Sequence, residues 1–493
     1  MPKKNSSNTI RKNSINRRNP NSSKTLTEAL NNVPLSLFHF RAFLTAGMGF
    51  FTDAYDLFII GIVITLLKVQ WHLTPSQVGL LGSSTLIATL LGAFVFGHIA
   101  DRYGRKKVYG LEAAIMAIAA ISSAFSPNFM WLLISRLILG VGIGGDYPVS
   151  GVIMSEYSNQ KNRGQLVSLV FSMQALGLVI GPIVALTLLS SGIHTNIAWR
   201  LMLGLGALPA LAVIYLRRTL PESPRFVERI GGNVSKAAAS IELYSKGVIK
   251  NVSRKNVTVK KGLFTFLNDK RNLMLIVGTA GCWFLLDYAY YGNTISTPLV
   301  LKSVAPHAIL LQQLSWSLLI FAVAAAPGYI FAFTNIDRIG HRRLQWIGFI
   351  MMGLCFGIIG IIPSVSHNVL PFLFIYGASY FFTEFGPNVT TFVIPTEVFS
   401  INGRATGHGI AAGIGKLGAF IGVFLFPVFT AKFGLSGTLL ISAGFAFCGA
   451  LLTLTLPEPA GKSLEEVSEE QRFVIVGKPL ALAKVAVKPQ KIN

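Results

Sequence analysis

The chain has 493 residues, of which 52% are hydrophobic and only 13% are charged, and its mean hydropathy is +0.57. Soluble globular proteins average about 25% charged residues, so this composition excludes a water-soluble globule. Apolar runs long enough to cross a bilayer recur from about residue 42 to residue 456. The sequence therefore predicts an all-α polytopic membrane protein.

The net charge of +23 comes from 43 Lys and Arg against 20 Asp and Glu. In a soluble chain this excess would suggest nucleic acid as a partner. Here the basic residues gather in residues 1–41, in the 217–271 stretch and in short loops such as Arg105-Lys106-Lys107, as the positive-inside rule predicts for cytoplasmic segments. We therefore expect a lipid bilayer and no nucleic acid as the partner. Residues 1–41 are predicted to be a basic cytoplasmic tail without the apolar stretch of a signal peptide.

Apolar windows bounded by polar or Pro- and Gly-containing turns predict twelve membrane-spanning helices. In chain order they lie near residues 42–67, 77–100, 108–126, 129–155, 164–191, 198–216, 273–300, 308–334, 344–362, 368–396, 406–431 and 436–456. We expect six helices in an N-terminal half (42–216), six in a C-terminal half (273–456), a cytoplasmic linker (217–272) and a cytoplasmic tail (457–493). The odd-numbered loops contain only Lys68, Lys302 and Lys432 as basic residues, which predicts that both termini are cytoplasmic.

Three short motifs recur in the two halves at nearly constant separation. Asp101-Arg102-x-Gly104-Arg105-Lys106 recurs as Asp337-Arg338-x-Gly340-His341-Arg342, Glu156 with Arg163 recurs as Glu397 with Arg404, and Pro221-Glu222 recurs as Pro457-Glu458, at separations of 236, 241 and 236 residues. Three matches in one order favour two six-helix halves related by a pseudo-two-fold axis along the membrane normal, with a substrate path between them, which is a transporter architecture. The charged members are expected to form a conformational latch at the helix ends: Asp101, Arg102, Arg105, Glu156, Arg163, Asp337, Arg338, Glu397 and Arg404.

Several charged residues fall inside the predicted spans, where a charge at mid-bilayer costs about 2.5–3.5 kcal/mol on insertion scales. They are Asp53, Asp56, Glu112, Arg136, Asp146, Asp287, Glu384 and Lys416. Two cations cannot neutralise six acids, so some carboxyls must be protonated for part of a cycle or face water, as in a proton-coupled carrier. The alternatives are a packing role for Asp53 and Asp56 and a structural bridge between Arg136 and Asp146.

The seventh span carries Trp283, Asp287 and Tyr291 at positions i, i+4 and i+8, which places them on one helix face. An indole N–H, a carboxyl and a phenol on one face favour a binding site over simple packing. Gln174 and Asn388 add amides in the fifth and tenth spans. These amides are either further ligands or groups that hydrogen-bond one helix to another.

Two motif matches do not support an enzyme. Gly140-x-Gly142-x-x-Gly145 lies inside the fourth span, where it predicts close helix packing and not a dinucleotide site. Gly461-Lys462-Ser463 lacks the opening glycine of a phosphate-binding loop, because Leu456 stands there. We expect no enzyme activity, no metal and no cofactor, with the proton as coupling ion.

The loop Gly97-x-x-x-Asp101-Arg102-x-Gly104-Arg105-Lys106 resembles the cytoplasmic signature of the major facilitator superfamily. More specific segments resemble the phosphate:proton symporters of plants and fungi, and this resemblance runs from about residue 42 to residue 466. The segments are Phe50-Phe51-Thr52-Asp53-Ala54-Tyr55-Asp56, Gly144-Gly145-Asp146-Tyr147-Pro148, Trp283-Phe284-Leu285-Leu286-Asp287, Phe385-Gly386-Pro387-Asn388 and Gly415-Lys416-Leu417-Gly418-Ala419.

The resemblance implies the major facilitator fold and a phosphate site lined by Tyr147, Gln174, Trp283, Asp287, Tyr291 and Asn388. It implies a proton route through Asp53, Asp56, Glu112, Asp146 and Asp287, with Arg136 and Lys416 balancing charge. The expected function is import of inorganic phosphate with protons across the cell (plasma) membrane by alternating access. The alternatives are the same fold carrying another small anion or an organic solute, and a phosphate sensor that does not transport. The oligomeric state is not predicted.

Overall fold

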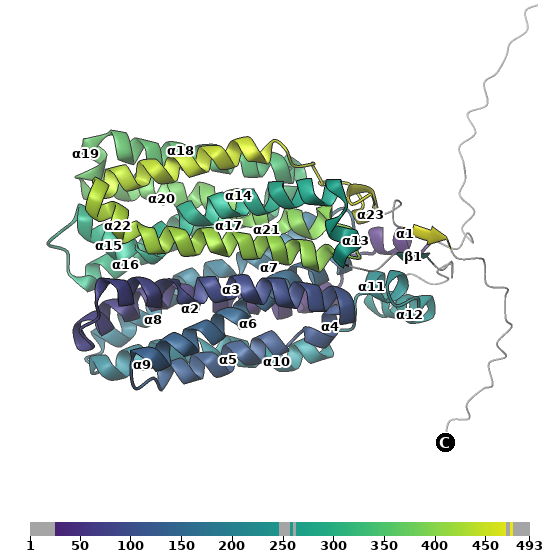
Figure 1. Ribbon diagram of the computed structural model, residues 1–493, viewed down its shortest axis with the longest axis horizontal. Coiled ribbons are helices and arrows are strands. Elements are labelled where there is room, and N and C mark those ends of the chain that lie inside the picture. The colour runs from purple at the N-terminus through teal and green to yellow at the C-terminus, as the bar shows by residue number, and fades with distance from the viewer. Residues whose placement is uncertain (1–24, 246–256, 260–262, 470–473, 477–493) are drawn as a thin grey trace, which may run out of the picture.

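The computed structural model describes residues 25–245, 257–259, 263–469 and 474–476. The remaining parts of the predicted tails and linker lie outside the described residues. The two halves of the chain form two bundles of long helices lying side by side, with the N-terminal half in purple and blue and the C-terminal half in teal to yellow (Figure 1). The predicted all-α fold in two six-helix halves is confirmed.

The N-terminal half contains nine helices that build six spans. They are α2 (Leu37–Gln70), α3 (Pro75–Tyr103), α4 (Arg105–Val108), α5 (Leu111–Ala124), α6 (Phe129–Tyr157), α7 (Arg163–Ser172), α8 (Gln174–Ser190), α9 (Thr195–Leu205) and α10 (Ala207–Thr219). The third, fifth and sixth spans each consist of two consecutive helices.

The C-terminal half is built in the same way. Its elements are α14 (Lys270–Ile295), α15 (Thr297–Val304), α16 (Leu310–Ile320), the π-helix η1 (Phe321–Ala325), α17 (Ala326–Ile339), α18 (His341–Ile361), α19 (Pro363–Ser366), α20 (Val369–Phe385), α21 (Pro387–Val398) and α22 (Arg404–Thr453). The 50 residues of α22 include Gly434, whose φ of 70° and ψ of 177° break the helix into the eleventh and twelfth spans.

Small residues let the helices of the N-terminal half approach closely. Added Cβ atoms at Gly140 and Gly144 of α6 would collide with the carbonyl oxygens of Thr85 and Thr89 on α3. Because lipid provides no hydrophobic force between helices, such close backbone contact is a main source of their association. The prediction of close helix packing for the Gly140 motif is therefore confirmed.

Short elements cover one end of the bundle, where α1, α11, α12, α13 and α23 gather (Figure 1). They are α1 (Leu26–Asn31), α11 (Pro224–Arg229), α12 (Val234–Tyr244), α13 (Leu263–Leu267) and α23 (Leu464–Val467), with the strands β1 (Val257–Val259) and β2 (Val474–Val476) paired antiparallel. Leu26, Leu30 and Val33 pack with Val227 and Ile241 in a small apolar cluster. The segment before the first span is thus attached to the linker.

Gly434 separates two spans at the end opposite these elements, so Lys432 beside it and Lys236 of α12 lie at opposite ends of the bundle. In a background with Cys282, Cys355 and Cys448 replaced by alanine, we expect an impermeant maleimide added to intact cells to label Lys432→Cys. Both Lys432 and Lys236 are exposed. Lys236→Cys, on α12, should react only after permeabilisation, because the basic linker is expected to stay in the cytoplasm. The reverse pattern would contradict the orientation, and labelling of both in intact cells would contradict the twelve-span count.

Candidate functional site

The fifth, eighth and tenth spans are irregular near the middle of the bundle, and predicted ligands lie at two of the irregularities. The fifth span changes helix at Met173, so Gln174 is the first residue of α8. The tenth breaks at Gly386, and Asn388 lies in the first turn of α21. The eighth contains the π-helical turn η1. Broken helices and π-turns inside a membrane are typical of binding sites, because they place backbone and side-chain polar groups within the protein.

In the N-terminal half, two predicted ligands bind a carboxyl that was predicted to carry protons. The phenol of Tyr147 donates a hydrogen bond to Asp53 Oδ2 at 2.6 Å, and the Gln174 amide donates to the same oxygen at 3.2 Å. All three side chains are buried. Asp53 Oδ1 has no hydrogen-bond partner among the described residues. A predicted proton carrier and two predicted phosphate ligands therefore share one site.

In the C-terminal half, Lys416 joins the face predicted on the seventh span. Its ammonium donates to Asp287 Oδ2 at 2.9 Å and to the Tyr291 hydroxyl at 2.8 Å. The same ammonium lies 4.9 Å from the centre of the Tyr147 ring, so it reaches the N-terminal half. The indole N–H of Trp283 interacts with Asp287 but makes no hydrogen bond of normal geometry among the described residues.

Tyr329 of α17 connects the two sides of the site and was not predicted. It donates to Gln174 Oε1 at 3.0 Å and accepts from the Asn388 amide at 2.8 Å. The same amide donates to Glu384 Oε2 at 2.5 Å. Tyr329 stands in an apolar span without a charged neighbour inside that span, so the sequence offers no signal for it. Glu384 was predicted only as a buried charge.

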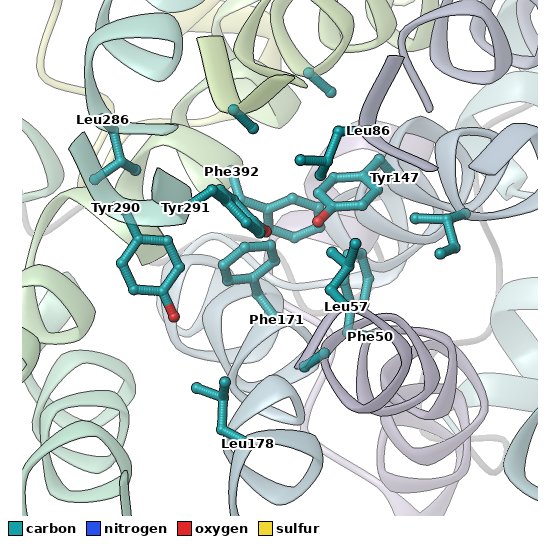
Figure 2. Close-up of a cluster of buried hydrophobic side chains, with 14 of the residues drawn as sticks. Phe50, Leu57, Leu86, Tyr147, Phe171, Leu178, Leu286, Tyr290, Tyr291 and Phe392 are labelled. Carbon is teal, nitrogen blue, oxygen red and sulfur yellow. The ribbon is translucent and has the colours of Figure 1, made fainter. Parts of the chain in front are cut away.

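Aromatic rings enclose the polar centre (Figure 2). Phe171 and Phe392 stack with their ring centres 4.5 Å apart, and the phenol oxygens of Tyr147 and Tyr291 turn toward the space beside them. A cavity of about 20 Å³ lies next to Gln174, Tyr291 and Tyr290, which is room for about one water molecule. In this state the polar side chains of the centre hydrogen-bond to one another.

Four of the predicted charges lie away from this centre and are paired differently from the bridge considered above. Arg136 lies 3.8 Å from Asp56 Oδ1 and donates to the Asp56 carbonyl at 3.2 Å, so it does not bridge to Asp146. Asp146 and Glu112 instead both bind Arg217, at 2.8 and 2.9 Å.

The assignment of Arg217 to the linker was wrong. Arg217 is fully buried in the last turns of α10, so the spans contain a buried cation that the count of two cations against six acids omitted. The error arose because a basic residue at the edge of an apolar window resembles the positive charges of a cytoplasmic loop.

The motif charges of the two halves meet across the interface at the covered end of the bundle. Arg404 contacts Glu156 at 3.2 Å, and Arg163 contacts Glu397 at 2.9 Å. Each repeated acid therefore pairs with the base of the other half. Arg105 adds contacts to Glu156 at 3.0 Å and to Asp101 at 3.1 Å.

Two aspartates bind helix N-termini of the opposite half. Asp101, near the end of α3, accepts from the backbone N–H groups of Ala405 and Thr406 at 3.2 and 2.6 Å. Asp337, near the end of α17, accepts from Gly164 and Gln165 at 3.1 and 2.8 Å. A carboxylate at a helix N-terminus gains both hydrogen bonds and the favourable end of the helix dipole. Arg102 and Arg338, also predicted in the latch, form no ion pair within the described ranges.

The third repeated motif holds its own half together. Glu222 accepts from the N–H groups of Arg105 and Lys106 at 3.2 and 3.1 Å, and Glu458 accepts from those of His341 and Arg342 at 2.9 and 3.1 Å. The preceding glycines, Gly104 and Gly340, have φ of 105° and 97°, a conformation that other residues rarely adopt. His341 also lies 3.3 Å from Asp337 and 3.4 Å from Glu397.

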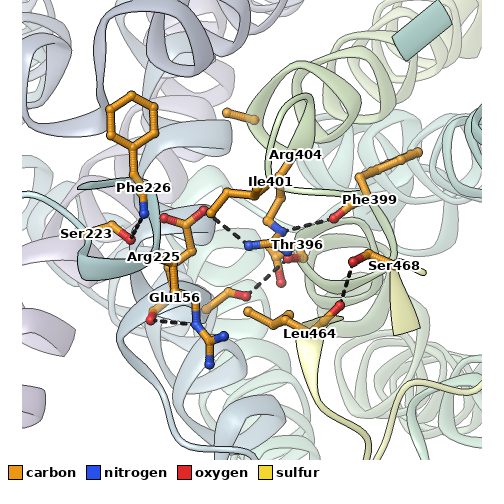
Figure 3. A network of polar contacts seen from close by, with 12 residues as sticks. Glu156, Ser223, Arg225, Phe226, Thr396, Phe399, Ile401, Arg404, Leu464 and Ser468 are labelled. Atoms are coloured by element: carbon orange, nitrogen blue, oxygen red, sulfur yellow. Dashed lines mark hydrogen bonds and ion pairs between the residues drawn. The ribbon is translucent and has the colours of Figure 1, made fainter. Parts of the chain in front are cut away.

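The covering elements attach to this latch (Figure 3). Arg404 reaches the Glu156 carboxylate while Arg225 of α11 donates to the Glu156 carbonyl at 3.4 Å. Arg225 also pairs with Glu465 of α23, which lies 3.3 Å from Arg229. Burial opposes ionisation of Glu465, yet the two arginines lower its pKa to about 2. The carboxylate therefore stays charged, and these pairs stay intact, throughout the physiological pH range.

Just beyond the centre, on the side away from the covered end, the two halves meet through apolar contact. Phe58 of α2 meets Phe321 of η1 edge to face, with ring centres 4.9 Å apart. Within the described part of the chain, no ion pair joins the two halves on that side. The centre itself offers phenol, amide, indole and ammonium donors around a small volume, a set that suits an anion with several oxygens.

Comparison with known proteins agrees with this arrangement. Residues 42–470 match the family model described as sugar (and other) transporter. The chain is 35% identical to a probable inorganic phosphate transporter 1-6 of Arabidopsis thaliana, over 90% of this chain and 96% of that protein. It is 34% identical to a low affinity inorganic phosphate transporter 1 of Petunia hybrida, over 90% and 95%.

The fold is similar to that of the major facilitator superfamily proton:xylose symporter XylE bound to 6-bromo-6-deoxy-D-glucose. The TM-score is 0.75 at 20% sequence identity, covering 88% of this chain and 99% of that one. A partially occluded inward open structure of the E. coli protein gives a TM-score of 0.69 at 19% identity, over 86% and 99%.

The pairing of Lys416 with Asp287 predicts a specific pattern of stabilities. Lys416→Met keeps most of the side-chain length but leaves a buried carboxylate without its cation, which should lower the free energy of unfolding by about 3–5 kcal/mol. Lys416→Met combined with Asp287→Asn should recover most of that loss, because no charge then remains unpaired. Thermal unfolding in detergent measures both.

The exposed Lys432→Met is the matched control, and its effect should stay within about 0.5 kcal/mol. If the double variant were as unstable as Lys416→Met alone, the ion pair would not be the cause of the loss.

Proposed function

The chain belongs to the sugar (and other) transporter family of the major facilitator superfamily, and on that premise we propose that it imports inorganic phosphate together with protons by alternating access. Its curated relatives are named transporters and not enzymes. The proposed location is the plasma membrane with both termini in the cytoplasm, supported by the basic residues of the tail and linker.

One observation carries the proposal: a buried lysine lies among phenol, amide and indole donors between the two halves. Tyr147, Gln174, Trp283 and Asn388 supply N–H and O–H groups, and Lys416 supplies positive charge. Dihydrogen phosphate has oxygens that accept from these groups and a hydroxyl that can donate to Asp287. Sulfate has no such proton at neutral pH, so a site containing a carboxylate disfavours it.

The hydrogen bonds of Asp53 suggest how protons are coupled to the anion. While ionised, Asp53 holds the Tyr147 phenol and one N–H of Gln174. Protonation removes the charge that attracts both donors, and they become available to phosphate. Anion binding in turn favours the protonated carboxyl, because a nearby negative charge disfavours a second one. The two ligands therefore bind cooperatively in the thermodynamic sense.

The remaining predicted proton-route residues lie further out and are charge-compensated. Asp56 faces Arg136, and Glu112 with Asp146 faces Arg217. We propose that these pairs pass protons from the central carboxyl while the latch opens. Opening toward the cytoplasm requires the Arg404–Glu156 and Arg163–Glu397 pairs to separate, whereas opening at the other end separates apolar surfaces such as Phe58 and Phe321.

Purified protein in liposomes should accumulate labelled phosphate against its gradient when the outside is acidified. Collapse of the proton gradient with an ionophore should abolish the accumulation, and labelled sulfate should not accumulate. Phosphate binding without accumulation would favour a sensor, and accumulation of another solute in its place would contradict phosphate as the substrate.

Asp53→Asn should separate exchange from accumulation. The amide cannot exchange a proton, so gradient-driven accumulation should fail, while exchange of internal for external phosphate needs no net proton movement and should persist. Asp287→Asn is the comparison, because it also removes the partner of Lys416 and should impair both processes. Equal loss of exchange and accumulation in Asp53→Asn would assign that residue to the anion site or to the fold.

A further inference from the structure

Glu384 is a carboxyl in the centre of the protein that the proposed function does not use. It lies in the last turn of α20 and is fully buried. Asp287 has Lys416 as its cation, but Glu384 forms no ion pair within the described residues. A buried carboxylate without a cation is costly, so its position calls for a functional explanation.

The groups that face Glu384 come from four helices. Asn388 of α21 donates to Oε2 at 2.5 Å, and Oε1 has no hydrogen-bond partner among the described residues. Tyr290 and Asp287 of α14, Tyr329 of α17 and Tyr380 of α20 interact with the same carboxyl. The amide and phenol donors stabilise the ionised form, whereas the buried setting and the charge of Asp287 oppose it. Such a group can both hold and release a proton.

Both N–H groups of the Asn388 amide are used in this state, because they donate hydrogen bonds to Glu384 and to Tyr329. It can donate to an anion only if one of them is released. A protonated Glu384 attracts the amide less than a carboxylate does, since hydrogen bonds to charged groups are roughly twice as strong as neutral ones. Protonation therefore frees the predicted phosphate ligand Asn388.

We propose that Glu384 is a second proton-coupling carboxyl, which takes up a proton with the anion and releases it on the cytoplasmic side. The inference rests on the proposed function and adds one proton to the transported set. The carboxylate becomes a carboxylic acid by binding H⁺ and returns by losing it, and no bond of phosphate forms or breaks. The transported species is H₂PO₄⁻, so every proton beyond the first moves one net positive charge.

The donor Asn388 has an equivalent in the N-terminal half, although the carboxyls that the two donors bind come from different spans. Tyr147 and Asn388 are separated by 241 residues, as are Glu156 and Glu397, so they occupy equivalent positions of the two halves. In this state each is held by a central carboxyl that has no ion pair among the described residues, Asp53 for Tyr147 and Glu384 for Asn388.

Hydroxyl groups lead from Glu384 toward the end of the bundle away from the latch. Tyr380, one turn before Glu384, donates to Thr294 at 3.1 Å and lies 3.3 Å from the Thr297 hydroxyl. The adjoining Ser296 lines a cavity of about 130 Å³ at that end. These hydroxyls place polar groups between the neighbourhood of the carboxyl and that cavity.

The test compares the charge moved with the phosphate taken up in liposomes, using the integrated current and labelled phosphate on the same preparation. In Glu384→Gln the charge per phosphate should fall by one elementary charge relative to the wild type. Glu384→Asp keeps a titratable carboxyl and should retain the wild-type ratio. Thr383→Val is the matched control, because the Thr383 hydroxyl donates only to the backbone of its own helix among the described residues, and it should also leave the ratio unchanged.

An unchanged ratio in Glu384→Gln would overturn the inference and leave the proposed function intact. Failure of the wild type to accumulate phosphate would overturn both. If Glu384→Gln binds phosphate without turnover, proton uptake on phosphate addition to the detergent-solubilised protein replaces the current. One proton fewer than in the wild type would support the inference, and an equal number would overturn it.

Discussion

The cost of an uncompensated charge inside a bilayer-spanning bundle determines how this protein is organised. Three cations compensate four acids. Arg217 pairs with Glu112 and Asp146, Arg136 pairs with Asp56, and Lys416 pairs with Asp287. Two central carboxyls, Asp53 and Glu384, have only neutral donors as hydrogen-bond partners in the described part of the chain. Removing a buried ion from water without a counter-ion costs several kcal/mol. The positions without a cation are therefore those where a proton can be the compensating charge.

The same constraint distinguishes the two ends of the interface. At the covered end, charged groups are paired reciprocally: each half contributes an acid to an arginine of the other and an aspartate to one of its helix N-termini. These contacts are short-ranged and directional, so they are lost together when the halves separate. On the other side of the centre the halves meet through apolar contacts such as Phe58 with Phe321, which are less directional. In the proposed alternating access, opening at the covered end thus requires breaking specific bonds, and opening on the other side requires exposing apolar surface.

Much of this could be predicted from the sequence because it depends on local pattern. Apolar length gave the spans, and the repeated acid and base motifs indicated two halves. The pairing could not be predicted, because Glu156 binds Arg404 and not its own neighbour Arg163. Arg217 was misplaced because one residue at a span edge carries no sign of its depth. Tyr329 has no charge and no repeat, so only the folded chain shows that it links Gln174 to Asn388.

The central hydrogen bonds also explain why anion and proton would move together. The donors of Tyr147, Gln174 and Asn388 satisfy carboxylates in the state described here, and the same donors are the proposed phosphate ligands. These donors cannot hydrogen-bond to a carboxylate and to phosphate at the same time. An anion entering without protons would leave Asp53 and Glu384 ionised and short of donors, and a buried acceptor left unsatisfied costs about 1–3 kcal/mol, more if charged. If the two unsatisfied carboxylates together cost about 2.8 kcal/mol, the anion-bound state without these protons is about a hundredfold less populated than the anion-bound state with them. In the proposed transport cycle, tight coupling of anion and proton then follows from competition for hydrogen bonds within the site.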